Sequence, residues 1–306
     1  MTFTTQLQTA QRRADSLLCI GLDPEPVRFP GGWAGDASRI FDFCAAIVDA
    51  THDLVIAFKP QIAYFAAYRA EDQLERLIAH IKRVAPDVPV ILDAKRGDIG
   101  ATAAMYAVEA FERYQADALT LSPFMGLDSI EPYFKYPGKG LILLCRTSNP
   151  GGSDLQAQRL LGDGVAHTAE GLAATGSATA ADAACCSQPG DRLFEHIARL
   201  AAGPWNRSGQ LGLVVGATFP AEIARVRALA PTLPLLIPGV GAQGGDAQAT
   251  VQAGWRGSAV PGQARSSGPI IVNSARAVLY ASAGADFASA ARGVADHTRR
   301  LLNAAR

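Results

Sequence analysis

Short apolar runs alternate with longer helical patterns along nearly the whole chain of 306 residues. Nearly unbroken hydrophobicity is typical of strands that are buried on both faces of a parallel sheet. We expect eight such strands, at 17–22, 54–58, 90–92, 118–121, 141–145, 211–215, 235–237 and 270–272. Helical periodicity is clearest over 40–50, 73–85, 102–114 and 221–230. Eight strand–helix units favour a closed α/β fold, the (β/α)8 TIM barrel, over a doubly wound sheet, and no GxGxxG motif opens the first unit.

Two stretches interrupt this rhythm inside what we expect to be a single barrel domain over residues 1–306. The stretch 162–190 is rich in Ala, Gly, Ser and Thr, and it is predicted to be a flexible surface insertion after the fifth strand. The stretch 254–268, between the seventh and eighth strands, contains several Gly and Ser residues and is a candidate lid.

Composition excludes several classes of protein. Lys and Arg total 28 and so do Asp and Glu, a balance that argues against a broad nucleic-acid-binding surface. The apolar runs are far shorter than the ~20 residues of a membrane span, and the N-terminus has no signal-peptide pattern, so we expect a soluble cytoplasmic protein. Five cysteines without CxxC spacing predict reduced, buried thiols. Five scattered histidines predict no metal site.

Charged residues gather where the first three strands end. Because the carboxyl ends of barrel strands meet at one mouth, we expect Asp23, Lys59, Asp93 and Lys95 to converge there. Asp93 and Lys95 are two residues apart and so face the same side of their strand, whereas Asp98 lies beyond it. One charged residue at a strand end is usually a solvated cap, but two lysines and two aspartates together predict an alternating charge network.

The seventh strand is followed by a sequence typical of a phosphate-binding turn. Gly241, Gly244 and Gly245 would let backbone N–H groups approach an anion, and Gln243 can donate from its amide. Arg276, after the eighth strand, supplies a cation suited to bidentate contact with phosphate. A glycine-rich turn alone is weak support, because tight turns also need glycine.

The run DAKRGDIGAT at 93–102 resembles the DxKxxDI signature of the orotidine 5′-phosphate decarboxylase family, and in particular its bacterial type 2 branch. Five further segments resemble the family in the same order along the chain: GLDP at 21–24, FKP at 58–60, TSNPG at 147–151, PGVGAQGG at 238–245 and NSAR at 273–276. The insertion at 162–190 is longer than the family's usual connection. The resemblance covers nearly the whole chain.

This resemblance implies the conversion of orotidine 5′-phosphate to UMP, the last step of de novo pyrimidine nucleotide biosynthesis, without a cofactor or metal. It implies that Lys95 protonates C6 of the pyrimidine, with Asp93 and Lys59 in the charge network beside it. It also implies a homodimer in which Asp98, Ile99 and Thr102 enter the site of the neighbouring chain. The remaining implied contacts are Asp23 to the ribose, Ser148 to the pyrimidine edge, and Gln243 and Arg276 to the 5′-phosphate.

The reaction explains why these residue types are needed. Loss of CO2 from C6 leaves an electron pair in the ring plane that the π system cannot absorb, so a fixed cation beside C6 must stabilise it. Two alternatives stay open from the sequence. One is a Mg²⁺-dependent decarboxylase of sugar keto-acid phosphates on a similar barrel. The other is a non-catalytic binder of phosphorylated metabolites.

Overall fold

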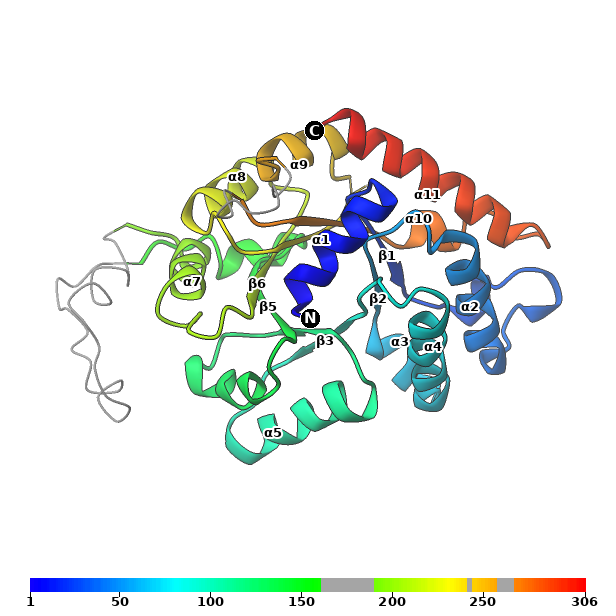
Figure 1. Ribbon diagram of the computed structural model, residues 1–306, viewed down its shortest axis with the longest axis horizontal. Coiled ribbons are helices and arrows are strands. Elements are labelled where there is room, and N and C mark those ends of the chain that lie inside the picture. Colours follow the sequence, from blue (N-terminus) through cyan, green and yellow to red (C-terminus); the bar gives the residue numbers. More distant parts are fainter. Residues whose placement is uncertain (161–189, 241–243, 258–266) are drawn as a thin grey trace.

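The computed structural model describes residues 1–160, 190–240, 244–257 and 267–306, and contains eight strands alternating with helices (Figure 1). The strands are β1 (Leu18–Leu22), β2 (Ala57–Pro60), β3 (Ile91–Arg96), β4 (Ala118–Leu121), β5 (Gly140–Arg146), β6 (Leu211–Val215), β7 (Leu235–Pro238) and β8 (Ile270–Ser274). The α-helices are α1 (Phe3–Ala14), α2 (Ile40–Thr51), α3 (Ile62–Ala66), α4 (Glu71–Val84), α5 (Gly100–Val108), α7 (Leu193–Ala202), α8 (Pro220–Leu229), α9 (Ala247–Gly254), α10 (Arg276–Leu279) and α11 (Phe287–Ala304). A π-helical turn, Glu109–Arg113, continues α5.

The eight strands form one parallel sheet that closes into a barrel. Their order is β2-β1-β8-β7-β6-β5-β4-β3. Two parallel bridges between the outermost strands, Phe58 to Val90 and Gln61 to Asp93, bring β2 beside β3 and complete the ring. The predicted (β/α)8 barrel is therefore confirmed.

Alternation along each strand divides the core into two layers. On β1, Leu18, Ile20 and Leu22 pack against the surrounding helices, whereas Cys19 faces the barrel interior. This is the period-2 arrangement of a strand that is buried on both sides. It explains why the strand sequences are apolar at nearly every position.

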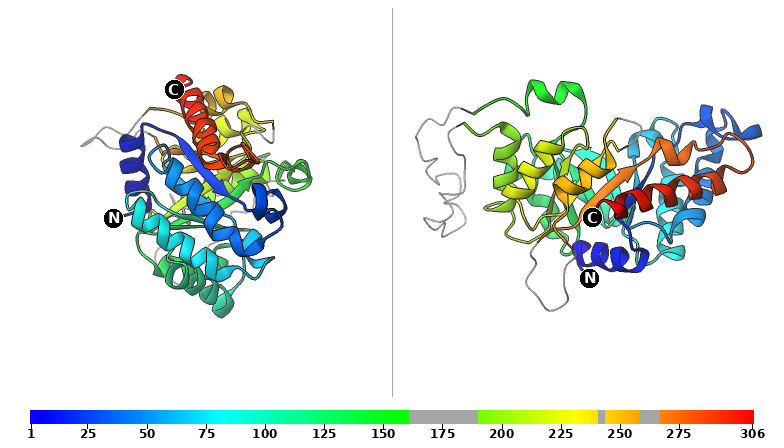
Figure 2. Two further views of the ribbon diagram at one scale, coloured as in Figure 1. Left: turned by 90° about the vertical axis from the view of Figure 1, so that its right-hand side faces the viewer. Right: turned by 90° about the horizontal axis from the view of Figure 1, so that it is seen from above.

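Helix α1 closes the N-terminal end of the barrel. Phe3, Leu7 and Ala10 pack into the same cluster as the inward-facing Cys19 and Ile142. In Figure 1, α1 lies across the middle of the ring formed by the outer helices. The right view of Figure 2 shows it on one side of the barrel, with the segment that follows β5 on the opposite side. The open mouth is therefore at the carboxyl ends of the strands.

Strand boundaries differ from the sequence expectation at two functionally important places. β2 begins at Ala57 and continues to Pro60, and β3 continues to Arg96. Lys59, Asp93 and Lys95 therefore lie within strands and are held by the sheet itself. Of the two loose stretches, 161–189 and 258–266 lie outside the described residues. No helix in the described ranges is both long enough and apolar enough to span a membrane.

Candidate active site

A cavity of about 490 Å³ opens at the carboxyl ends of the strands. Because the strands are parallel, their C-terminal residues all lie at this mouth, where the active sites of (β/α)8 barrels are found. Its lining includes six of the predicted site residues: Asp23, Lys59, Asp93, Lys95, Ser148 and Arg276.

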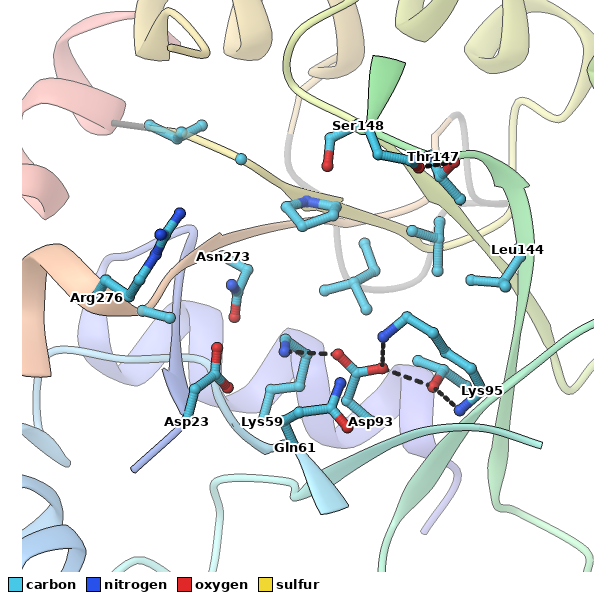
Figure 3. Close-up of a pocket in the computed structure, with 18 of the residues that line it drawn as sticks. Asp23, Lys59, Gln61, Asp93, Lys95, Leu144, Thr147, Ser148, Asn273 and Arg276 are labelled. Carbon is cyan, nitrogen blue, oxygen red and sulfur yellow. Dashed lines mark hydrogen bonds and ion pairs between the residues drawn. The ribbon is translucent and has the colours of Figure 1, made fainter. Parts of the chain in front are cut away.

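Two lysines hold the two oxygens of one carboxylate at the base of this cavity. Lys59 Nζ donates to Asp93 Oδ2 at 2.8 Å, and Lys95 Nζ donates to Asp93 Oδ1 at 2.7 Å. Figure 3 shows Asp23, Lys59, Asp93 and Lys95 in a row along one side of the cavity. The side chain of Lys59 is 5% exposed, whereas that of Lys95 is 48% exposed and can reach a bound molecule. The predicted alternating charge network is present.

The network fixes the charge of its central members. Burial by itself raises the pKa of the Asp93 carboxyl, but Lys59 and Lys95 outweigh burial, and this pKa lies well below its ordinary value. Burial by itself lowers the pKa of the Lys59 amine, but Asp93 and then Asp23 raise it above its ordinary value. Asp93 is therefore anionic and Lys59 cationic across the physiological pH range.

Asp23 lines the cavity just after the end of β1. Among the described residues, its buried Oδ1 has no partner. Burial raises the pKa of the Asp23 carboxyl, Lys59 partly offsets the rise, and Asp93 adds to it. A buried acceptor that lacks a donor inside the protein is suited to receive hydroxyl groups from a ligand.

The loop after β5 contains Ser148 and is held in place by a buried arginine at the end of that strand. Arg146 is 1% exposed, forms an ion pair with Glu222 of α8, and donates to Ser153 Oγ at 2.9 Å. Gln156 Oε1 accepts the N–H of Thr147 at 2.8 Å. These contacts hold the loop on both sides of Ser148, which lines the cavity.

The turn after β7, which the sequence predicts to bind phosphate, is described in part. Gly244 has φ +82°, a left-handed conformation that favours glycine. A Cβ at Gly245 would lie 2.6 Å from the carbonyl oxygen of Gly239, so only glycine fits there. Gly241 and Gln243, both predicted site residues, lie outside the described residues.

Arg276 begins α10 and lines the cavity near this turn (Figure 3). It is exposed, and it forms no hydrogen bond or ion pair within the described part of the chain. Its guanidinium is therefore available to an anionic ligand.

Asp98, Ile99 and Thr102 do not line the cavity of their own chain. Asp98 Oδ1 accepts the N–H of Ile99 at 2.8 Å, and Ile99 is 54% exposed. The structure thus separates the predicted site residues into a group at the mouth of the barrel and a group at the outer surface beside β3.

Six polar residues that line the cavity are not among the predicted site residues: Gln61, Tyr64, Thr120, Thr147, Asn149 and Asn273. Thr120 lies inside the apolar strand β4, is 1% exposed, and donates to Asp93 Oδ1 at 2.9 Å. A buried hydroxyl in an otherwise apolar strand needs a hydrogen-bond partner, so the position of Thr120 in the apolar run 118–121 could have identified it as a site residue.

Within the described ranges, no group of three or more His, Cys, Asp or Glu side chains is arranged to hold a metal ion. Both oxygens of Asp93 are engaged by ammonium groups.

Comparison with known proteins identifies relatives over the whole chain. Residues 16–292 match the family described as orotidine 5′-phosphate decarboxylase / HUMPS. The chain is 69% identical over 307 residues to an orotidine 5′-phosphate decarboxylase of Methylibium petroleiphilum, with both chains covered completely. It is 70% identical over 305 residues to the protein of that name from Leptothrix cholodnii, covering 100% of this chain and 98% of the relative. The solved structure of Leishmania donovani OMP decarboxylase is similar with a TM-score of 0.74 and 36% identity, covering 99% of each chain.

Proposed function

The chain belongs to the orotidine 5′-phosphate decarboxylase / HUMPS family, and we infer that it is a carboxy-lyase that converts orotidine 5′-phosphate to UMP and CO2. This reaction is the last step of de novo pyrimidine nucleotide biosynthesis. The observation that carries the mechanism we propose is the Asp93 carboxylate held between the ammonium groups of Lys59 and Lys95 at the base of the cavity.

Lys95 is the group that we propose acts on C6. The bond between C6 and the carboxylate carbon breaks, CO2 leaves, and the electron pair stays on C6 in the ring plane. The ammonium of Lys95 stabilises this pair and then transfers a proton to C6, which gives UMP and a neutral amine. Because the Lys95 side chain is half-exposed, solvent can return the proton after product release.

Preorganisation explains how this charge acts on the barrier. Two unit charges 4 Å apart interact by about 4 kcal/mol at an effective dielectric constant of 20. Asp93 holds Lys95 in place before the substrate arrives, so little reorganisation is needed as charge develops at C6. Lys59 balances Asp93 on its other oxygen and keeps that carboxylate ionised.

The rest of the cavity suits a nucleotide. We propose that Arg276, with the turn containing Gly244 and Gly245, binds the 5′-phosphate, and that Gln243 and Gly241 contribute to the same turn. Ser148 would contact the pyrimidine edge and Asp23 the ribose. Phosphate lies far from the bond that breaks, so its binding energy can be used to seat the base against Lys95.

We also propose a homodimer with shared active sites. Four large apolar side chains are exposed in the Asp98 segment, in α5 and in the segment after β4: Ile99, Met105, Phe124 and Met125 are 54%, 63%, 81% and 45% exposed. The first and last of these segments are neighbours, because a Cβ at Gly97 would lie 3.1 Å from Cβ of Ser122. A cluster of large exposed apolar residues is typical of a protein–protein interface. A second copy would cover it and would bring Asp98, Ile99 and Thr102 to the neighbouring cavity.

We also propose that the protein is located in the cytoplasm. The thiols of Cys19, Cys44 and Cys145 are free and buried, as expected in a reducing compartment. Burial raises the pKa of the Cys19 thiol to about 12, so this thiol stays protonated.

Turnover of orotidine 5′-phosphate, followed by the loss of its ultraviolet absorbance, tests the proposed function. We expect full activity in EDTA, because no step uses a metal; the Mg²⁺-dependent alternative requires activity to disappear. The variant Lys95→Ala tests whether catalysis can be lost while nucleotide binding is kept. It should lose decarboxylation and still bind UMP, because the phosphate contacts remain. A wild-type protein that binds UMP without turnover would instead support the non-catalytic binder.

A further inference from the structure

One buried hydroxyl contacts both the carboxylate and the backbone of the charge network. Thr120 Oγ1 donates to Asp93 Oδ1 at 2.9 Å and accepts the N–H groups of Ala94 and Lys95, each at 3.0 Å. We propose that Thr120 is a positioning residue, whose hydroxyl sets the geometry of the Asp93–Lys95 pair that protonates C6. The proposal rests on the function proposed above and adds a residue to it.

The valence of the hydroxyl determines the direction of these bonds. A threonine hydroxyl has one hydrogen to donate and two lone pairs that accept. Two backbone N–H groups occupy both lone pairs, so the single hydrogen points to Asp93. Asp93 is ionised and accepts it, and the same oxygen accepts from Lys95 Nζ at 2.7 Å. Every bonding position of Thr120 Oγ1 is therefore used within the network.

The backbone at this point is strained. Lys95 has φ +48°, a left-handed conformation that a residue with a Cβ adopts only at an energetic cost. The pairing of β3 with β4 also shifts register between Leu92 and Arg96. This shift forms a β-bulge, in which the successive N–H groups of Ala94 and Lys95 both donate to the hydroxyl of Thr120.

The position of Thr120 makes it a rigid support. It lies on β4, is 1% exposed, and pairs in register with Ile142 of β5. Its β-branched side chain has few rotamers, and the surrounding strand fixes its backbone. A support on a neighbouring strand holds the bulge without occupying the space of the substrate.

The test compares Thr120→Val with Thr120→Ser. Valine has a similar shape but no hydroxyl, whereas serine keeps all three contacts. We expect the kcat of Thr120→Val to fall about 100-fold, because misplacement of a catalytic group by about 1 Å has that effect. KM and the affinity for UMP should change much less, since the contacts proposed for the phosphate and the pyrimidine edge come from Arg276 and Ser148. Thr120→Ser should keep a kcat near that of the wild type.

Thr250→Val is the matched control. Thr250 is buried in α9, and among the described residues its hydroxyl has no hydrogen-bond partner. It therefore reports on the cost of a buried Thr-to-Val exchange outside the network, and its kcat should be unchanged. All rates are divided by the number of UMP-binding sites, so a poor yield of folded Thr120→Val does not imitate a loss of kcat. Thr120→Ala, which is smaller and also lacks the hydroxyl, provides the same comparison if the valine variant does not fold.

Three results would overturn the proposal: a hydroxyl-free variant with wild-type kcat per site, a loss confined to KM, or a serine variant as slow as the hydroxyl-free one. A wild-type protein without turnover would instead refute the proposed function and this inference with it.

Discussion

At the residue scale, the site stores unfavourable electrostatic energy in Asp23. Its carboxyl is buried, one oxygen lacks a donor among the described residues, and its pKa is raised, first by burial. Ionised Asp23 is thus less stable in the folded protein than in the unfolded chain. Binding-site residues that lack a partner in the free protein commonly lower its stability in this way.

Asp23→Asn should therefore stabilise the free protein at neutral pH. The folded-state pKa of Asp23 lies above its unfolded value, so the wild type loses stability as pH rises between the two pKa values and the variant does not. We expect a Tm a few degrees higher than wild type at pH 7. The difference should vanish below the ordinary aspartate pKa of about 3.9, where both states are protonated. Equal Tm values at pH 7 would contradict this account, and KM should rise in either case.

Arg276 provides the second prediction at this scale. Arg276→Ala should lower kcat/KM for orotidine 5′-phosphate by roughly 100-fold, because a charge-assisted contact contributes about 1.5–3 kcal/mol. Orotidine without its phosphate is the control substrate, and its kcat/KM should change little. Equal losses on both substrates would mean that Arg276 acts on some part other than the phosphate.

At the scale of elements, α1 seals the barrel through a close contact with β5. Gly140 begins β5, and a Cβ there would lie 2.7 Å from Cγ of Phe3, inside the space of the ring. The backbone N–H of Phe3 also donates to the carbonyl of Gly138 at 2.7 Å. The glycine is needed because the aromatic ring rests directly on the first residue of the strand.

A double-mutant cycle tests this seal. Phe3→Ala should lower the free energy of unfolding by about 3–5 kcal/mol, and Gly140→Ala by about 1–3 kcal/mol. In the Phe3→Ala background, Gly140→Ala should cost far less, because the ring that it meets is gone. Denaturant unfolding measures each value. Additive losses would show that the two residues act independently, and kcat should stay near wild type because the site is at the other end of the barrel.

Elements also show where sequence reasoning succeeds and where it stops. Five expected strands (17–22, 118–121, 141–145, 211–215 and 235–237) match the structure to within one residue at each end, because buried strands are continuously apolar. β3 was expected to end at 92 and continues to Arg96, because its polar end faces a cavity. The left-handed turn at Lys95 and its support by Thr120 depend on a contact between two strands, which no local pattern encodes.

At the scale of the whole molecule, one chain holds an incomplete set of predicted site residues. Asp23, Lys59, Asp93 and Lys95 line the cavity, while Asp98, Ile99 and Thr102 do not, and Ile99 is exposed. The sequence motif places Asp98 only three residues after Lys95, and its spacing alone could not show that the two side chains diverge. A two-fold dimer would restore the set, because each chain would lend its Asp98 segment to the other.

Mixing two inactive variants tests this arrangement. Lys95→Ala and Asp98→Ala homodimers should each be nearly inactive. After the two chains are unfolded, mixed in equal amounts and refolded, about half of the dimers should contain one chain of each kind. Each mixed dimer then has one site with both residues and one with neither, so about a quarter of all sites should regain activity.

A mixture of Lys95→Ala with Lys59→Ala is the matched control. Both lysines contact the same Asp93, so both serve the cavity of their own chain, and no mixed dimer can assemble an intact site. Recovery in the first mixture and none in the second would establish shared sites. If Asp98 served its own chain, the first mixture would stay as inactive as the second.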